Sequence, residues 1–291
     1  MTIQAKKPHQ TTLDYERTQP VAEATKLLRG PFLGRMEFKH VVFASDIHGS
    51  LSVTRELLDR FYGNTDAIVF LGDYVDRGKH GVEVLELLCS KMLEGENGGN
   101  TKIIMLRGNH ESEEMNERYG FMKEVKEKLG YVSYGVYSRF FSRLPFAAVV
   151  NNWFCVHGGL SMGIAKPEDV SALPWPNELS MYMYDRGVAN QTAMQLVWND
   201  PTDDPETYFG KNPARGEGVF TFGKTALDDF LSRNGLTGVI RGHESPGGIK
   251  KQMDSRLITV STTWYVTGRP VSVLELDNGK MYEVELRRNP P

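Results

Sequence analysis

The first third of the chain alternates short apolar runs with segments of helical periodicity. Apolar runs within 40–49, 66–71 and 101–111 predict buried strands, each followed by glycine and polar residues. Apolar residues recur every three to four positions in 52–61 and 81–93, which predicts helices. This alternation predicts the α/β class with a parallel sheet, whose carboxyl edge is where open α/β sheets bind ligands.

The remainder of the chain continues to mix helices with strands. Its periodicity predicts helices at 111–130, 135–145, 188–197 and 225–235. Apolar runs predict two strands within 146–160 and further strands at 237–242, 257–262, 270–276 and 281–287, while the rest of 161–222 is irregular. No repeat or linker divides the chain. We therefore expect one domain over residues 31–291, preceded by a polar arm over residues 1–30 that is partly disordered.

Composition narrows the class of protein. The chain has 291 residues, of which 40% are hydrophobic, and a net charge of −3, so neither nucleic acid nor an acidic membrane is favoured as a partner. It contains no apolar run of about 20 residues and no apolar signal-peptide core, so we expect a cytoplasmic protein. The two cysteines, Cys89 and Cys155, lie in apolar runs and are expected to be reduced.

Polar clusters follow five of the predicted strands, in "SDIHG", "GDYVDRG", "LRGNHE", "VHGGL" and "IRGHE". Any one such residue is more often a turn or core residue than a ligand. Five clusters beside glycines, which allow sharp turns and close backbone approach, are hard to produce by chance. Carboxylate, imidazole and amide groups without cysteine suit a borderline or hard divalent metal. The sequence therefore predicts a metal site built from these clusters: Asp46, His48, Asp73, Asn109, His110, His157 and His243.

The order and spacing of these motifs resemble the signature of the PPP-type metallophosphatases. These are the serine/threonine phosphoprotein phosphatases of the calcineurin-like metallophosphoesterase superfamily. The resemblance runs from about residue 40 to residue 265. It implies a central β-sandwich of two mixed sheets flanked by helices, which carries a phosphomonoester hydrolase. The implied reaction is direct in-line attack on phosphate by metal-activated water, and the implied substrate is a phosphoprotein or phosphopeptide.

The resemblance also assigns metal ligands. It implies two divalent ions, with manganese as the foremost choice and iron or zinc as alternatives. Asp46 and His48 would bind the first ion, and the carboxylate of Asp73 would bridge the two ions. The second ion would be bound by Asn109, His157 and His243.

Five further roles follow from the same resemblance. His110 would act as the general acid that protonates the leaving alkoxide, and Asp76 would orient it. Arg77 would bind the phosphate with Arg215 as its partner, and Asn109 would also contact phosphate. A guanidinium suits this task because its planar fork matches two phosphate oxygens.

The match to the family is imperfect at three places. Ser45 stands where the family usually has glycine, and the spacing after Arg215 is one residue longer. The "SAPNY" stretch of the eukaryotic enzymes is replaced by "VSTTWYVTG", in which Tyr265 or Trp264 would take the place of the tyrosine over the site. These departures predict a divergent or prokaryotic member and leave substrate choice and inhibitor sensitivity open.

Three other functions remain compatible with the motifs. A metallophosphodiesterase or nuclease shares several motifs, but it usually ends in Gly-His-x-His, where this chain has Ser245 in place of the second histidine. A dinucleoside-polyphosphate hydrolase of the same superfamily typically differs in the residues after "DIHG", which is a weak distinction. A non-catalytic binding module is disfavoured because every candidate ligand and the candidate acid are present. The sequence identifies neither the physiological substrate, nor the native metals, nor a regulatory subunit.

Overall fold

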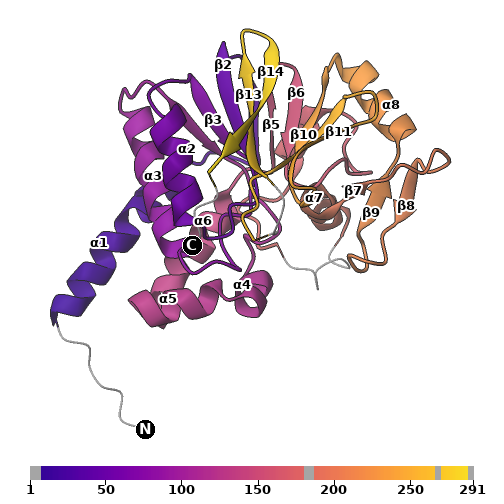
Figure 1. The fold of residues 1–291 in the computed structure, drawn as a ribbon. Helices are drawn as coiled ribbons and strands as arrows, with labels where there is room; N and C mark the ends of the chain where they lie inside the picture. Colours follow the sequence, from indigo (N-terminus) through magenta and orange to yellow (C-terminus); the bar gives the residue numbers. More distant parts are fainter. Residues whose placement is uncertain (1–7, 180–186, 266–269, 288–291) are drawn as a thin grey trace.

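The computed structural model describes residues 8–179, 187–265 and 270–287. Two β-sheets pack face to face, and helices cover the outer side of each sheet (Figure 1). The predicted α/β class, with two mixed sheets flanked by helices, is confirmed.

The five-stranded sheet carries the βαβ pattern predicted for the first third of the chain. Its strands, in spatial order, are β14 (Lys280–Leu286), β13 (Val271–Asp277), β2 (His40–Ala44), β3 (Ala67–Phe70) and β4 (Lys102–Met105). Strands β2, β3 and β4 are parallel, and β13 pairs antiparallel with both β2 and β14. The crossovers between the parallel strands are α2 (Leu51–Phe61) and α3 (Gly81–Glu96).

The second sheet has six strands and faces the first. In spatial order they are β1 (Phe32–Met36), β5 (Ala147–Val150), β6 (Trp153–Val156), β10 (Gly238–Arg241), β12 (Leu257–Ser261) and β11 (Gly248–Gln252). A separate small sheet contains β7 (Asp200–Pro201), β9 (Phe220–Phe222) and β8 (Phe209–Lys211). The remaining helical elements are α1 (Pro8–Thr25), α4 (Glu113–Tyr119), α5 (Phe121–Leu129), η1 (Tyr131–Ser133), α6 (Tyr134–Arg143), η2 (Pro167–Ala172), α7 (Val188–Trp198) and α8 (Lys224–Asn234).

Strand residues alternate between two hydrophobic cores. Val41 and Phe43 of β2 face the space between the sheets, where they join residues of the opposite sheet such as Ile240. Val42 and Ala44 belong instead to the core under helices α2 and α3. Both faces of these strands are buried, which explains why they form continuous apolar runs in the sequence. Burial of each large apolar side chain contributes about 1.5–3 kcal/mol relative to exposure.

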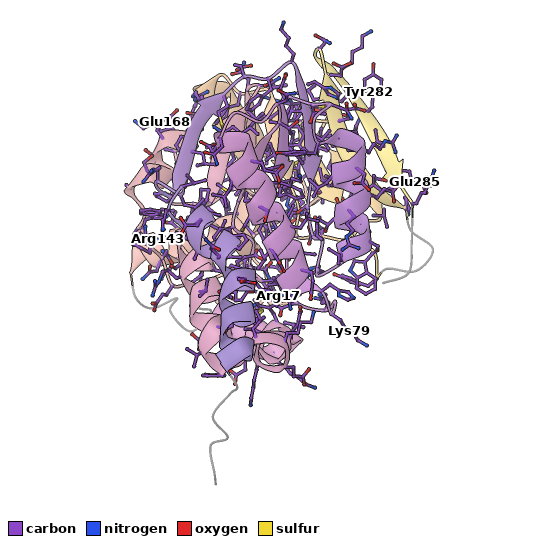
Figure 2. The ribbon with its side chains drawn as sticks, turned by 90° about the vertical axis from the view of Figure 1, so that its left-hand side faces the viewer. Arg17, Lys79, Arg143, Glu168, Tyr282 and Glu285 are labelled. Atoms are coloured by element: carbon purple, nitrogen blue, oxygen red, sulfur yellow. The ribbon has the colours of Figure 1, made fainter. Side chains whose placement is uncertain are left out.

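The N-terminal segment differs from the expected polar arm. Residues 8–25 form α1, and its C-terminal half buries Val21 and Ala24 against the core under α3 and α6. Arg17 of α1 donates to Glu83 (2.8 Å) and Glu86 (3.3 Å) of α3, in the helical layer that faces the viewer in Figure 2. A few apolar residues at helical spacing are thus enough to pack a mostly polar segment. The division of the chain at residue 30 remains a prediction.

Other elements also depart from the sequence-based expectation. The helix predicted over 111–130 is broken into α4 and α5 at Gly120, whose φ of 114° ends one helix and begins the next. Strands β1 and β11 and the small sheet were not predicted. Cys89 and Cys155 are buried free thiols, as expected. Within the described ranges, no helix combines the length and apolar character needed to cross a bilayer.

Candidate active site

The loops that follow β2, β3, β4, β6 and β10 meet at one edge of the two sheets. Backbone hydrogen bonds join the first two loops, since the amide of Asp46 donates to Gly72 (3.1 Å) and that of His48 donates to Asp73 (3.0 Å). A cavity of about 470 Å³ opens at this edge. Its lining includes eight of the ten predicted site residues: Asp46, His48, Asp73, Arg77, Asn109, His110, Arg215 and His243. The other two, Asp76 and His157, are fully buried beside it.

Backbone strain is concentrated in these loops. Six of the predicted site residues have left-handed φ angles, namely Asp46 (57°), His48 (46°), Asp73 (60°), Asp76 (69°), Arg77 (63°) and His243 (69°). Each such residue costs on the order of 1–3 kcal/mol and is tolerated where the surroundings enforce it, which is typical of functional sites. The accompanying glycines are required by close approach, since a Cβ at Gly108 would overlap the Asp73 carboxylate.

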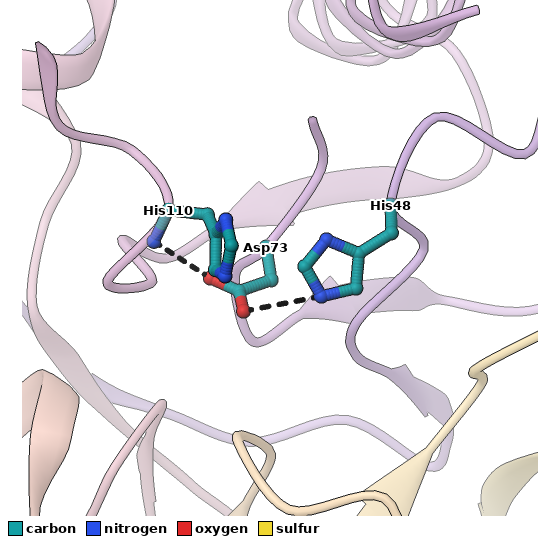
Figure 3. A group of neighbouring side chains, drawn as sticks. All are labelled: His48, Asp73 and His110. Atoms are coloured by element: carbon teal, nitrogen blue, oxygen red, sulfur yellow. Dashed lines mark hydrogen bonds and ion pairs between the residues drawn. The ribbon is translucent and has the colours of Figure 1, made fainter. Parts of the chain in front are cut away.

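Asp73 lies at the centre of the site, between two groups of candidate ligands. On one side its Oδ2 is 3.4 Å from Nε2 of His48, and its Oδ1 accepts a hydrogen bond from the backbone amide of His110 (3.0 Å; Figure 3). Nδ1 of His48 lies 2.8 Å from the carbonyl oxygen of Val75. A ring proton on Nδ1 therefore leaves the Nε2 lone pair directed at Asp73. Asp46 Oδ1 lies 3.9 Å from the same Nε2.

The second group has the same design. Asp73 Oδ1 is 3.4 Å from Nε2 of His157, and Nδ1 of His157 lies 3.0 Å from the carbonyl oxygen of Leu71. The side-chain oxygen of Asn109 lies 2.9 Å from His157 Nε2 and 3.1 Å from His243 Nδ1. Carbonyl partners on the outer ring nitrogen are the usual way in which proteins orient a metal-binding histidine.

The donor set fits divalent cations. Within the described part of the chain, two groups bring ligand atoms within 4.8 Å of one another, and both contain Asp73; they are His48–Asp73–His110 and Asp73–His157–His243. Nε2 of His243 is buried without a hydrogen-bond partner among the described residues. Two buried carboxylates, three imidazoles and an amide that converge in this way need positive charge, and their chemistry suits a borderline or hard metal.

Burial and neighbouring charges shift the pKa values of several candidate ligands. Burial, followed by the neighbouring His110, lowers the pKa of His48 to about 3, so its imidazole is neutral. Burial raises the pKa of Asp46 to about 6. Burial also acts to raise the pKa of Asp73, but the imidazoles of His157, His110 and His48 hold that pKa well below its ordinary value. Asp73 is therefore an anion surrounded by imidazoles, as a bridging ligand requires.

His110 is held by a buried carboxylate. Its Nδ1 lies 2.8 Å from Oδ2 of Asp76, which also accepts from the side chain of Asn116 (3.1 Å). The second oxygen of Asp76 accepts from the amide of Phe121 (2.9 Å), so the carboxylate is fixed on both sides. Burial acts to lower the pKa of His110, but Asp73 and Asp76 outweigh it and raise that pKa. A histidine with this partner is suited to carry and donate a proton.

The two predicted phosphate-binding arginines have different surroundings. The Arg77 guanidinium lies between the rings of Tyr119 (4.9 Å) and Tyr265 (5.1 Å) and pairs with no acidic residue in the described ranges. Arg215 lines the same cavity, but its Nε is 2.7 Å from Asp200. The stacked rings hold Arg77 without neutralising it. Asp200 holds Arg215 at the cavity wall and neutralises part of its charge.

Sequence reasoning missed several residues that support the site. Glu111 ends the "LRGNHE" motif, and its carboxylate accepts from the amides of Gly108 (2.8 Å), Asp73 (2.8 Å) and Tyr74 (2.9 Å). Burial, followed by the charge of Asp73, raises the pKa of Glu111 to about 7. Its position beside two candidate site residues was the only signal available. Asn116 lies within a predicted helix, and nothing in the pattern indicated its contact with Asp76.

Asp200 and Arg241 form a second support behind the cavity. Arg241 is fully buried and donates to Asp200 (2.9 Å) and Glu244 (2.6 Å). Burial raises the pKa of Asp200, but His243, Arg241 and Arg215 outweigh it and lower that pKa to about 2. The motifs "WNDP" and "IRGHE" contain these residues, but only the fold brings them together.

Comparisons with known proteins agree with this geometry. Residues 39–246 match the model of the calcineurin-like phosphoesterase family. The serine/threonine-protein phosphatase 4 catalytic subunits of Eremothecium gossypii and Saccharomyces cerevisiae are each 34% identical over 247 residues, which is 82% of this chain and 74% of theirs.

Solved structures give the same fold. A serine/threonine phosphatase from Saccharomyces cerevisiae, described as similar to human phosphatase PP5, has a TM-score of 0.80 at 25% identity over 95% of this chain and 91% of its own. A cold-active protein-tyrosine phosphatase from Shewanella has a TM-score of 0.67 at 18% identity, over 91% of this chain and 84% of its own, and supports the fold alone. This chain therefore belongs to the calcineurin-like phosphoesterases and, within them, to the PPP family of serine/threonine protein phosphatases.

Proposed function

We propose that this hydrolase removes phosphate from phosphoserine and phosphothreonine side chains of proteins and that it binds two divalent ions, with manganese foremost. The observation that carries the proposal is the convergence of two ligand groups on Asp73. One ion would be held by Asp46, His48 and Asp73, and the other by Asp73 together with Asn109, His157 and His243.

We place His110 outside the ligand set, although its ring nitrogen lies near Asp73. Its Nδ1 bond to the Asp76 carboxylate (2.8 Å) stabilises the protonated ring, which suits a proton donor. Asp46 supplies a buried carboxylate on the same side of Asp73 and completes the first ion's set. His110 would give its proton to the oxygen of the leaving serine or threonine, and Asp76 would keep the ring oriented.

Bound divalent ions would lower the pKa of a water molecule, so that hydroxide is available at neutral pH, and would offset charge on the phosphoryl group. The protein's own groups do the rest. Arg77, fixed between Tyr119 and Tyr265, would bind phosphate oxygens through two hydrogen bonds. Arg215 and Asn109, which line the same cavity, would also contact the phosphate. Burial of the ligand set excludes water from all but the cavity side.

Ser245, which follows the "IRGHE" motif, favours a monoester substrate. Ser245 occupies the position at which related phosphodiesterases carry a second histidine, and its hydroxyl lies 3.4 Å from that of Thr263. A serine hydroxyl is a poor substitute for an imidazole as a metal ligand. Among the described residues, this position of the cavity therefore carries a hydroxyl where a diesterase of this superfamily would use an imidazole.

Three substrates assayed side by side test the proposal. The protein, reconstituted with manganese, is given a phosphothreonine peptide, diadenosine tetraphosphate and bis-p-nitrophenyl phosphate, and kcat/KM is measured for each. We expect the phosphopeptide to be hydrolysed with the highest kcat/KM, and His110→Asn to abolish most of that activity. A higher kcat/KM for either of the other substrates would replace the proposed function. A cytoplasmic location stays a prediction from the sequence.

A further inference from the structure

A lysine that no catalytic role requires lines the active-site cavity. Lys250 belongs to β11, which begins at Gly248 and lies at the edge of the six-stranded sheet (Figure 1). The chain reaches this strand from His243 through a turn in which Gly247 (φ 80°) and Gly248 (φ 76°) both have left-handed backbones. The turn folds β11 back beside the site. Lys250 thereby becomes part of the cavity wall that also contains Arg215 and Tyr265.

The strand register shows which face of β11 carries Lys250. Side chains alternate along a strand, and Ile249 packs into the core between the sheets, so Lys250 points to the opposite face. Its partner on β12 is Thr259, whose hydroxyl lies 3.4 Å from Arg241. Side chains directly opposite on paired strands share a face. Lys250 therefore lies on the same face as the Arg241–Asp200 pair that supports Arg215.

The charges around the cavity leave Lys250 available to a substrate. Asp200 is engaged by Arg215 and Arg241, and Glu244 accepts a 2.6 Å bond from Arg241. Lys250 forms no ion pair with any residue in the described ranges 8–179, 187–265 and 270–287. The two arginines are assigned to the phosphate under attack. A third cation in the same cavity, on a long flexible stem, suits an anionic group beside that phosphate.

We infer that Lys250 selects substrates that carry a second anionic group next to the phosphorylated residue. This inference rests on the proposed phosphatase function and names its substrate class: phosphopeptides with a neighbouring acidic side chain or a neighbouring second phosphate. Both sources offer oxygen anions to an ammonium group. The attraction between such partly exposed charges weakens as salt is added.

Three peptides that differ at a single position test the inference. Each contains one phosphothreonine, and the flanking position carries alanine, glutamate or phosphoserine. The wild type is compared with Lys250→Ala, Lys250→Glu and, as a matched control, Lys251→Ala. Lys251 is the next residue of β11, points to the other face and is exposed. Circular dichroism and hydrolysis of p-nitrophenyl phosphate check that each variant is folded and loaded with metal.

We expect the wild type to hydrolyse the glutamate and phosphoserine peptides with higher kcat/KM than the alanine peptide. Lys250→Ala should reduce that preference about five-fold, which is about 1 kcal/mol at 1.4 kcal/mol per factor of ten. Lys250→Glu should reverse it, and Lys251→Ala should keep it. A preference for the glutamate peptide assigns an acidic side chain, whereas a preference confined to the phosphoserine peptide assigns a doubly phosphorylated segment.

Two results would overturn the inference, and they are distinguishable. If all peptides are hydrolysed but Lys250→Ala keeps the wild-type ratios, the phosphatase function stands and Lys250 does not select the substrate. If the wild type hydrolyses p-nitrophenyl phosphate but none of the three peptides, the proposed protein substrate is wrong and the inference falls with it.

Discussion

Replacement of Asp76 by asparagine tests how the candidate acid is held. The carboxylate of Asp76 accepts three hydrogen bonds, from His110 (2.8 Å), Asn116 (3.1 Å) and the amide of Phe121 (2.9 Å), and its side chain is fully buried. Asparagine keeps the shape but loses the charge, and one end of its side chain becomes a donor. Whichever way the amide points, its NH₂ group meets at least one of these donors.

The size of the effect follows from these contacts. A hydrogen bond to a charged group contributes about 1.5–3 kcal/mol, which corresponds to about a 10- to 150-fold change in an equilibrium or rate constant. Loss of the anionic partner removes that stabilisation from protonated His110. Asp76→Asn should therefore reduce the rate for alkyl phosphate esters by about this factor. The buried donor–donor contact should also lower the free energy of unfolding by about 1–3 kcal/mol.

The assay compares two leaving groups. The threonine alkoxide of a phosphothreonine peptide must be protonated as it leaves, whereas the p-nitrophenolate of p-nitrophenyl phosphate leaves with little help. Asp76→Asn should therefore slow the peptide reaction far more. Asp66→Asn is the matched control, because the Asp66 carboxylate also accepts backbone bonds, from Lys39 and His40 (2.9 Å each), but lies away from the site. Equal losses on both substrates in Asp76→Asn would refute the proposed positioning of an acid.

Three further predictions concern the arginines and the N-terminal helix. Arg77→Ala should raise KM and weaken inhibition by inorganic phosphate by about 10- to 150-fold, measured as Ki. Arg215→Ala should also weaken phosphate inhibition, and the effects of the two substitutions should not add in the double variant, because both side chains would bind one phosphate group. An unchanged Ki in Arg215→Ala would show that Arg215 only pairs with Asp200. Glu83→Gln should lower the free energy of unfolding by about 0.5–1 kcal/mol at pH 7, measured by urea denaturation, because Glu83 bonds Arg17 across two helices.

The Glu83 prediction also carries a pH dependence. Burial acts to raise the pKa of Glu83, but hydrogen bonds from Lys128 and Arg17 outweigh it and lower that pKa below its ordinary value of 4.5. The stabilisation by an acid with a lowered pKa is present above its unfolded-state pKa and is lost as pH falls through the folded-state pKa. The stability difference between wild type and Glu83→Gln should therefore shrink as the pH falls below 4.5. A difference that is unchanged in acid would contradict the role of this ion pair.

The elements that the sequence predicted well are those with a strong local signal. Strands β2, β3 and β4 are buried on both faces, so they form unbroken apolar runs in the sequence. The candidate ligands Asp46, Asp73 and Asn109 lie within a few residues of the ends of these strands, and that position indicated where they would meet. The structure brings every predicted site residue to one edge of the sheets; the roles assigned to them remain proposals.

The elements that escaped prediction depend on distant partners. Strand β11 reads "GIKKQ", a pattern with too few apolar residues to indicate a strand, and its backbone pairs only because β12 lies beside it. Helix α1 is mostly polar and is held by Arg17 and two buried alkyl side chains. The hydrogen bonds that hold the site residues in place, such as that between Asp76 and Asn116, join residues that are far apart in the sequence, so no local sequence pattern predicts them.

Metal content measured together with activity tests the central claim most directly. The chelated protein should be inactive, and titration with manganese should restore turnover of a phosphothreonine peptide as two ions per chain bind, counted by elemental analysis. Asp73→Asn should bind both ions more weakly, because its carboxylate lies against both ligand groups. Full activity in a protein shown to be free of metal, or saturation of activity in Asp73→Asn at the wild-type metal concentration, would contradict a two-ion site centred on Asp73.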